Sequence, residues 1–177
     1  MFGRRKRSKN TRLTPEQVQS RIRGLKAKAN GAKAEQIVQA SADYFYQLDK
    51  SIIVHKRQES LQQKTGADFS LFLPNGAGYL ECKSRNSKSI PLDAVAPHQI
   101  EQLLQLEEMG HLGLIIVRLV IDEQAHWFLL KASQWSHPTK KSFNVKELEA
   151  FKVEMTEVEG LNLINLPKAI NNIIGAN

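Results

Sequence analysis

The fold of this chain is decided by residues 67–84, which read ADFSLFLPNGAGYLECKS. Two largely apolar runs, 67–73 and 78–84, lie on either side of the turn-forming residues Pro74-Asn75-Gly76-Ala77. Apolar runs of strand length separated by Pro, Asn and Gly are typical of a β-hairpin. The stretch therefore predicts two paired antiparallel strands.

Three ionisable side chains are brought together by this predicted hairpin. Successive residues of a strand point to opposite faces, so Glu81 and Lys83 are expected on one face and their neighbours Leu80, Cys82 and Ser84 on the other. Asp68 begins the first strand, and a turn near Asn75-Gly76 folds it back opposite the region of Glu81 and Lys83. Two carboxylates and an ammonium group are thus predicted to converge.

Phosphodiester hydrolysis requires groups of these kinds. Asp68 and Glu81 are predicted to hold Mg²⁺, with Mn²⁺ as a substitute, because Mg²⁺ is usually bound by one or two carboxylates and retained waters. Lys83 is predicted to orient or deprotonate the attacking water and to offset the charge that develops on the phosphate. The backbone carbonyl of Cys82 is a candidate further ligand. The alternative is an exposed Glu-Lys charge pair with no catalytic role, which is common on strands.

The rest of the chain supplies further strands and flanking helices. Hydrophobic periodicity predicts an α/β (α+β) domain with a mixed five-stranded sheet flanked by helices, extending over residues 13–177. Thr14 and Gln17 have the spacing of a capping pair at the start of the first helix. The expected helices are 15–29, 32–48, 96–109, 145–152 and 167–174, and the strands outside the hairpin are 51–55, 112–121 and 126–130.

Positive charge is concentrated at the N-terminus. Residues 1–30 contain ten Lys or Arg and one acid, although the whole chain of 177 residues has a net charge of only +7. Residues 1–12 are predicted to be a disordered basic arm, because they have too few apolar side chains to form a core. A block of this kind binds the phosphates of nucleic acid, although a solvated or localisation tail is the alternative. The expected DNA-binding residues of this segment are Arg4, Arg5, Lys6, Arg7, Lys9, Arg12, Arg21, Arg23, Lys26 and Lys28.

Several classes of protein are not expected from the composition. No apolar run approaches the roughly 20 residues that cross a bilayer, and the basic N-terminus lacks the apolar stretch of a signal peptide. We therefore expect a cytoplasmic protein with no membrane partner. Cys82 is the only cysteine, so neither an intramolecular disulfide nor a zinc framework is expected.

Residues 31–130 resemble the PD-(D/E)xK nucleases and, among them, the RecU-type Holliday-junction resolvases of Gram-positive bacteria and their phages. The match is carried by short motifs along the chain. They are Gly31-Ala32-Lys33-Ala34-Glu35, Ile53-Val54-His55-Lys56, Thr65-Gly66-Ala67-Asp68, Glu81-Cys82-Lys83, Pro91-Leu92, His98-Gln99-Ile100-Glu101 and Gly113-Leu114-Ile115-Ile116-Val117.

This resemblance implies a restriction-endonuclease-like core and a homodimeric endonuclease that cuts branched DNA. It implies metal binding by Asp68 and Glu81, catalysis by Lys83, an active-site role for Gln99 and an outer metal-binding role for Glu35. From the residues alone, the commoner interpretation is that Gln99 is a surface glutamine at a helix start and that Glu35 is an exposed helix acid.

One departure from the family concerns the segment before Asp68. The family has a long insertion there, a projecting stalk that enters the junction centre, whereas this chain has only residues 57–67. Lys56 and Arg57 can still supply positive charge for DNA binding. A short stalk leaves the chemistry intact and leaves two alternatives open, namely a nuclease for flaps or duplex ends and a non-catalytic nucleic-acid-binding protein.

Overall fold

The computed structural model describes residues 13–26, 34–57, 67–137 and 139–175. The predicted basic arm, Lys28 and the segment that replaces the stalk lie outside these residues, as do the side chain of Lys26 and the Gly31 motif up to Lys33. No helix in the described ranges is long and apolar enough to span a bilayer.

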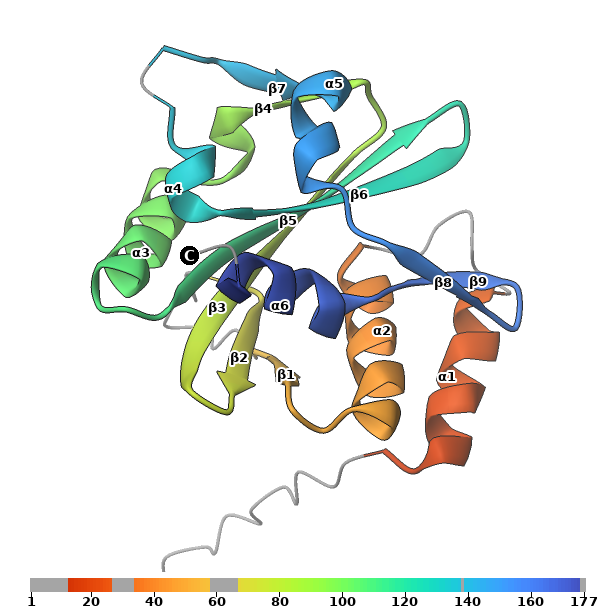
Figure 1. Cartoon of the computed structure of the whole chain (residues 1–177). Helices are drawn as coiled ribbons and strands as arrows, with labels where there is room; N and C mark the ends of the chain where they lie inside the picture. Colours follow the sequence, from red (N-terminus) through yellow and green to blue (C-terminus); the bar gives the residue numbers. More distant parts are fainter. Residues whose placement is uncertain (1–12, 27–33, 58–66, 138, 176–177) are drawn as a thin grey trace, which may run out of the picture.

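A mixed five-stranded sheet forms the centre of the molecule, in the order β1-β2-β3-β5-β6 (Figure 1). All neighbouring pairs are antiparallel except β3 and β5, which are parallel because helix α3 crosses over between them. The expected fold class is confirmed. The strands are β1 (Ile53–Lys56), β2 (Phe69–Leu73), β3 (Gly76–Arg85), β5 (Leu112–Ile121) and β6 (Gln124–Lys131).

Both hairpin turns are tighter than the sequence pattern indicated. Leu73 pairs with Gly76, so the turn of the first hairpin is Pro74-Asn75 rather than four residues. Ile121 pairs with Gln124, so the second turn is only Asp122-Glu123, both with positive φ. The Asp122-Glu123 turn has the hand that follows the natural twist of the strands. With the shorter turns, β3 and β6 each start two residues earlier than predicted, whereas β2 starts two residues later. Strand β1 also starts two residues later than predicted.

The first helix begins where its capping residues indicated. Helix α1 (Pro15–Lys26) follows Thr14, whose side-chain oxygen accepts a 3.3 Å hydrogen bond from the Gln17 amide, while the Gln17 side chain accepts a 2.9 Å bond from the Thr14 amide. The predicted capping pair is confirmed. Helix α2 (Ala34–Leu48) lies beside α1 (Figure 1).

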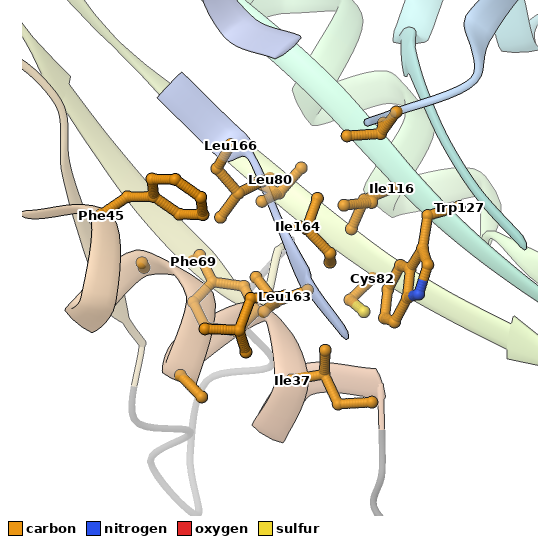
Figure 2. Close-up of a cluster of buried hydrophobic side chains, with 14 of the residues drawn as sticks. Ile37, Phe45, Phe69, Leu80, Cys82, Ile116, Trp127, Leu163, Ile164 and Leu166 are labelled. Carbon is orange, nitrogen blue, oxygen red and sulfur yellow. The ribbon is translucent and has the colours of Figure 1, made fainter. Parts of the chain in front are cut away.

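One face of the sheet is covered by α2, by α6 (Leu166–Gly175) and by a ribbon of β8 (Met155–Val158) and β9 (Leu161–Ile164). Figure 2 shows the core between these layers, where Ile37 of α2 approaches Cys82 and Trp127 of the sheet. Cys82 is buried here, on the face opposite to Glu81, as the strand alternation predicted. The side chain of Cys82 therefore belongs to the core.

The opposite face is covered by α3 (Pro97–Glu108) and by smaller elements between β3 and β8. Helix α3 lies very close to β5, because a Cβ built on Gly113 would collide with the backbone of Leu103. This close approach holds the middle of α3 against β5. The smaller elements are β4 (Ser89–Pro91), the 3₁₀ helix η1 (Leu92–Ala94), α4 (Ala132–Trp135), β7 (Ser142–Asn144), α5 (Val145–Leu148) and η2 (Glu149–Phe151).

Candidate active site

The end of strand β2 places Asp68 against strand β3. Phe69 pairs with Leu80, so Asp68 is the first residue beyond the paired part of β2. Its Oδ2 accepts a 2.8 Å hydrogen bond from the backbone amide of Cys82. Cys82 lies between Glu81 and Lys83, and the predicted convergence of these three ionisable groups is therefore present in the structure.

Glu81 is the buried centre of this cluster, with 1% of its surface exposed. Its Oε1 lies 2.6 Å from the Lys83 Nζ and accepts a 2.8 Å hydrogen bond from the Gln99 Nε2. Its Oε2 is buried as well, but no group among the described residues bonds to it. Leaving a buried carboxylate oxygen unsatisfied is costly, so this atom is positioned to accept a further polar or cationic partner.

Gln99 joins helix α3 to the carboxylate cluster. Its Oε1 accepts hydrogen bonds from the Ala96 amide at 3.1 Å, which caps the helix, and from the Lys83 Nζ at 3.3 Å. Its Nε2 is the donor to Glu81. The interpretation of Gln99 as an open surface glutamine is therefore wrong, since both ends of its amide contact the cluster.

The environment raises the pKa of both carboxyl groups. Burial is the main cause of the raised pKa of Glu81, the negative charge of Asp68 adds to it, and the hydrogen bond from Lys83 opposes it. Burial also raises the pKa of Asp68, the hydrogen bond from the Cys82 amide opposes this, and the charge of Glu35 adds to it. Two neighbouring carboxylates whose ionised forms are both disfavoured are a natural site for a cation.

Glu35 stands beside the cluster. Its Oε2 forms a 2.8 Å ion pair with the Nζ of Lys56, which links the first turn of α2 to β1. Its influence on the pKa of Asp68 is electrostatic, with no direct contact between the two side chains among the interactions found. This position is consistent with an outer role.

The donor set fits Mg²⁺ with a small number of protein ligands. In the described part of the chain, no group of three or more His, Cys, Asp or Glu side chains is arranged to hold a metal ion. Asp68 and Glu81 remain as a pair of hard oxygen donors, which is the number that Mg²⁺ usually takes from a protein. The Cys82 thiol is not a suitable donor, because burial raises its pKa well above the ordinary value and keeps it protonated.

Other predicted DNA-binding residues differ in their availability. The guanidinium of Arg57 lies 4.2 Å from the centre of the Tyr79 ring, and its Nη1 has no hydrogen-bond partner in the part of the chain that the structure describes. Arg21 instead forms an ion pair with Asp43 on α2. Arg21 lines a cavity of about 350 Å³ between α1, α2 and β1, together with Asp43, Lys56 and other residues.

No protein-family model and no curated protein matches this chain. Among solved structures, the chain is similar to Hjc of Archaeoglobus fulgidus, a Holliday junction resolvase from an archaeal hyperthermophile. The two share 14% sequence identity with a TM-score of 0.45, over 72% of this chain and 94% of Hjc.

Proposed function

We propose that this chain is a magnesium-dependent, structure-selective DNA endonuclease, and that it hydrolyses phosphodiester bonds of branched DNA such as four-way junctions. The observation that supports this most directly is the Oε2 of Glu81, which is buried beside Asp68, Lys83 and Gln99 and has no hydrogen-bond partner among the described residues. The basic N-terminal segment supplies the affinity for DNA.

Asp68 and Glu81 are the proposed metal ligands, with the backbone carbonyl of Cys82 as a third and Glu35 in an outer position. Bound Mg²⁺ polarises a phosphoryl oxygen and lowers the pKa of a coordinated water. Lys83 lies at the edge of the cluster, and 23% of its side chain is exposed. We propose two functions for its Nζ. It orients the attacking water and offsets negative charge in the transition state.

Gln99 is proposed to position Lys83 and Glu81 relative to each other. Its amide oxygen accepts from the Lys83 Nζ and its amide nitrogen donates to the Glu81 Oε1. Because the same oxygen caps α3, rotation of the amide is restricted. The ammonium group is therefore held next to the carboxylate in one orientation.

The alternative that Asp68, Glu81 and Lys83 form only a structural salt-bridge cluster is less well supported. A structural ion pair is stable in the interior when every polar atom has a partner. Here one oxygen of Glu81 has none among the residues described, and Asp68 further raises the pKa of Glu81. A cluster in which burial and a second carboxylate disfavour the ionised form of Glu81 is better explained as a site that binds a cation.

Cleavage of a DNA panel tests the proposal. Four-way junction, flap, linear duplex and single-stranded DNA are incubated with the protein in Mg²⁺, in Mn²⁺ and in EDTA. Asp68→Asn and Glu81→Gln should abolish cleavage and retain DNA binding, and Lys83→Ala should lower turnover by about 100-fold or more. Glu157→Gln, which changes an exposed carboxylate of β8, is the matched control. Full activity of Asp68→Asn or Glu81→Gln would show that the pair does not hold the metal.

A homodimer is part of the proposal, because twofold dimers are the commonest oligomers and paired cuts need two sites. The same core acting on flaps or duplex ends is the alternative substrate, and the panel distinguishes it. Sedimentation of the protein with and without junction DNA tests the dimer.

A further inference from the structure

Arg118 is a cationic residue in an otherwise apolar stretch of β5. It pairs in parallel register with Ser84 of β3, three residues beyond Glu81. Its guanidinium carbon lies 5.9 Å from the centre of the Trp127 ring on the neighbouring strand β6. Cys82 and Trp127 belong to the core under α2, so Arg118 lies at the border of that core, on the sheet face opposite to Glu81 and Lys83.

The guanidinium of Arg118 is incompletely paired. Its Nη1 reaches the hydroxyl of Ser84 at 3.4 Å, which is a long hydrogen bond. Its Nε is buried and has no partner among the described residues. No carboxylate in these ranges forms an ion pair with it, whereas Arg21 is paired with Asp43.

Such an arrangement has an energetic cost that a bound anion would remove. Burial lowers the pKa of Arg118, which reflects the loss of water around the charged group. The two Nη groups of a guanidinium form a fork that fits two oxygens of a phosphate, and such charge-assisted bonds are strong. The Ser84 hydroxyl adds a third donor beside this fork.

Among the described residues, no strand is paired with the edge of β3 beyond Leu80, and this edge lies between Arg118 and the carboxylate cluster. Strand β2 is paired with β3 only as far as Phe69 and Leu80, so the segment from Cys82 to Arg85 has no β2 residue beside it in register. Three residues of strand advance by about 10 Å from Glu81 to Ser84. A DNA strand with its scissile phosphate at Glu81 can therefore follow this edge towards Ser84.

We propose that Arg118 and Ser84 bind a phosphodiester that flanks the scissile phosphate on the DNA strand that is cut. This inference rests on the proposed nuclease function for the identity of the ligand. The site is a binding and positioning site: it holds the strand where it passes over the edge of β3 from the face of Glu81 and Lys83, and it takes no part in the chemical step.

The first experiment measures binding to four-way junction DNA in EDTA, where no cleavage occurs. Arg118→Gln should weaken binding about tenfold and lower the slope of log affinity against log salt by about one unit. The control is Lys50→Gln, which removes an exposed positive charge. Lys50 follows the C-terminal end of α2, whereas Glu35 lies at its N-terminal end. Lys50→Gln should leave affinity close to that of the wild type.

A second experiment locates the phosphate without changing the protein. A single neutral methylphosphonate linkage is moved along the strand on each side of the cleavage position. We expect one flanking position at which the neutral linkage weakens binding by the wild-type protein and has no further effect on Arg118→Gln. If Arg118→Gln does not fold, Arg118→Lys and Ser84→Ala replace it. In both variants the methylphosphonate at the same position should weaken binding less than it does in the wild type.

The outcomes separate this inference from the proposed function. Wild-type affinity in Arg118→Gln, or a methylphosphonate effect that is the same in both proteins, would overturn the Arg118 site even if Mg²⁺-dependent cleavage is found. A position-specific effect in a protein that cleaves no DNA would support the phosphate site and remove the nuclease. Inorganic phosphate that raises the melting temperature of the wild type but not of Arg118→Gln, with no methylphosphonate effect, would assign the site to a free anion and overturn the DNA assignment.

Discussion

The side-chain nitrogen of Gln99 donates a 2.8 Å hydrogen bond to the Oε1 of Glu81, joining the first turn of α3 to strand β3. The same amide accepts a hydrogen bond from Lys83, so it holds the two charged groups in one arrangement. Positioning interactions of this kind commonly contribute 10- to 100-fold to activity or metal affinity.

We therefore expect Gln99→Ala to lower the cleavage rate by about 10- to 100-fold while DNA binding is retained. The measurement is single-turnover cleavage at saturating DNA, which excludes effects on affinity. Gln105→Ala on the exposed side of the same helix is the control and should cleave at the wild-type rate. A wild-type rate in Gln99→Ala would reduce Gln99 to a helix cap.

A second prediction concerns the contact of α3 with the sheet. A Cβ at Gly113 would overlap the backbone of Leu103, so Gly113→Ala must push α3 away from β5. We expect a loss of about 1–3 kcal/mol of stability, as is usual for overpacking, and a lower cleavage rate because Gln99 moves with the helix. Gly24→Ala is the matched control: nothing lies within 4 Å of a Cβ there, and alanine in a helix should stabilise by about 0.5–1 kcal/mol. Chemical denaturation measures both.

Features that depend on residues close together in the sequence were predictable, whereas features that depend on contacts between distant segments were not. The hairpin and the shared face of Glu81 and Lys83 follow from local alternation and turn residues, and they were predicted correctly. Gln99 was identified only through its resemblance to a family motif, because its partners lie on another element. The ribbon that pairs Ser89 with Asn144 was missed, since strands of three residues that pair across a long stretch of chain leave no periodic pattern.

Two polar residues in apolar surroundings were also missed. Ser41 is fully buried in α2, where its hydroxyl donates to the Ile37 carbonyl and accepts a 2.9 Å hydrogen bond from the Ile164 amide. Arg118 interrupts the apolar residues of β5 in the same way. A single polar residue in such a segment is indistinguishable in sequence from one that faces solvent, and only tertiary structure shows which partners it has or lacks.

The third prediction is a pH dependence of stability from Asp43. Burial is the largest cause of its raised pKa, and it outweighs the opposing charge of Arg21. The folded protein therefore binds more protons than the unfolded chain just above the ordinary pKa of 3.8, and this contribution to stability is lost as the pH rises through the folded-state pKa. Asp43→Asn has no carboxyl group at this position and should not lose stability in this way. The stability of Asp43→Asn relative to the wild type should therefore increase as the pH rises from 4 to 7.

Asp49 provides a control of opposite sign for this measurement. Hydrogen bonds from Ser51 lower the pKa of Asp49, so its contribution is present at neutral pH and is lost as the pH falls. Asp49→Asn should therefore become less stable relative to the wild type as the pH rises towards and through 3.8, with little further change above about pH 5. If Asp43→Asn shows this same direction in chemical denaturation, burial is not the dominant influence on Asp43.

The fourth prediction concerns the basic arm. Deletion of residues 1–12 removes six of the ten Lys and Arg in the first thirty residues. If each contacts a phosphate, the slope of log affinity against log salt should decrease by about five units. Cleavage at saturating DNA should persist, because the carboxylate cluster lies in β2 and β3. An unchanged salt slope would mean that the arm does not contact DNA.

The last prediction concerns the segment from Arg57 to Ala67, which stands in place of the projecting stalk of the RecU-type resolvases. A stalk favours four-way junctions because linear duplex has no central opening, whereas phosphate contacts alone discriminate weakly. We expect this chain to prefer four-way junction over linear duplex by a smaller margin than a variant with a stalk grafted after Arg57, measured by competition between the two DNAs. A dimer restores part of the preference, since two sites at a fixed spacing match the crossing arms. The control is a flexible Gly-Ser insertion of the same length as the graft, which should not increase the preference. Equal and strong preference in all three proteins would show that selectivity arises from the nuclease core or its dimer.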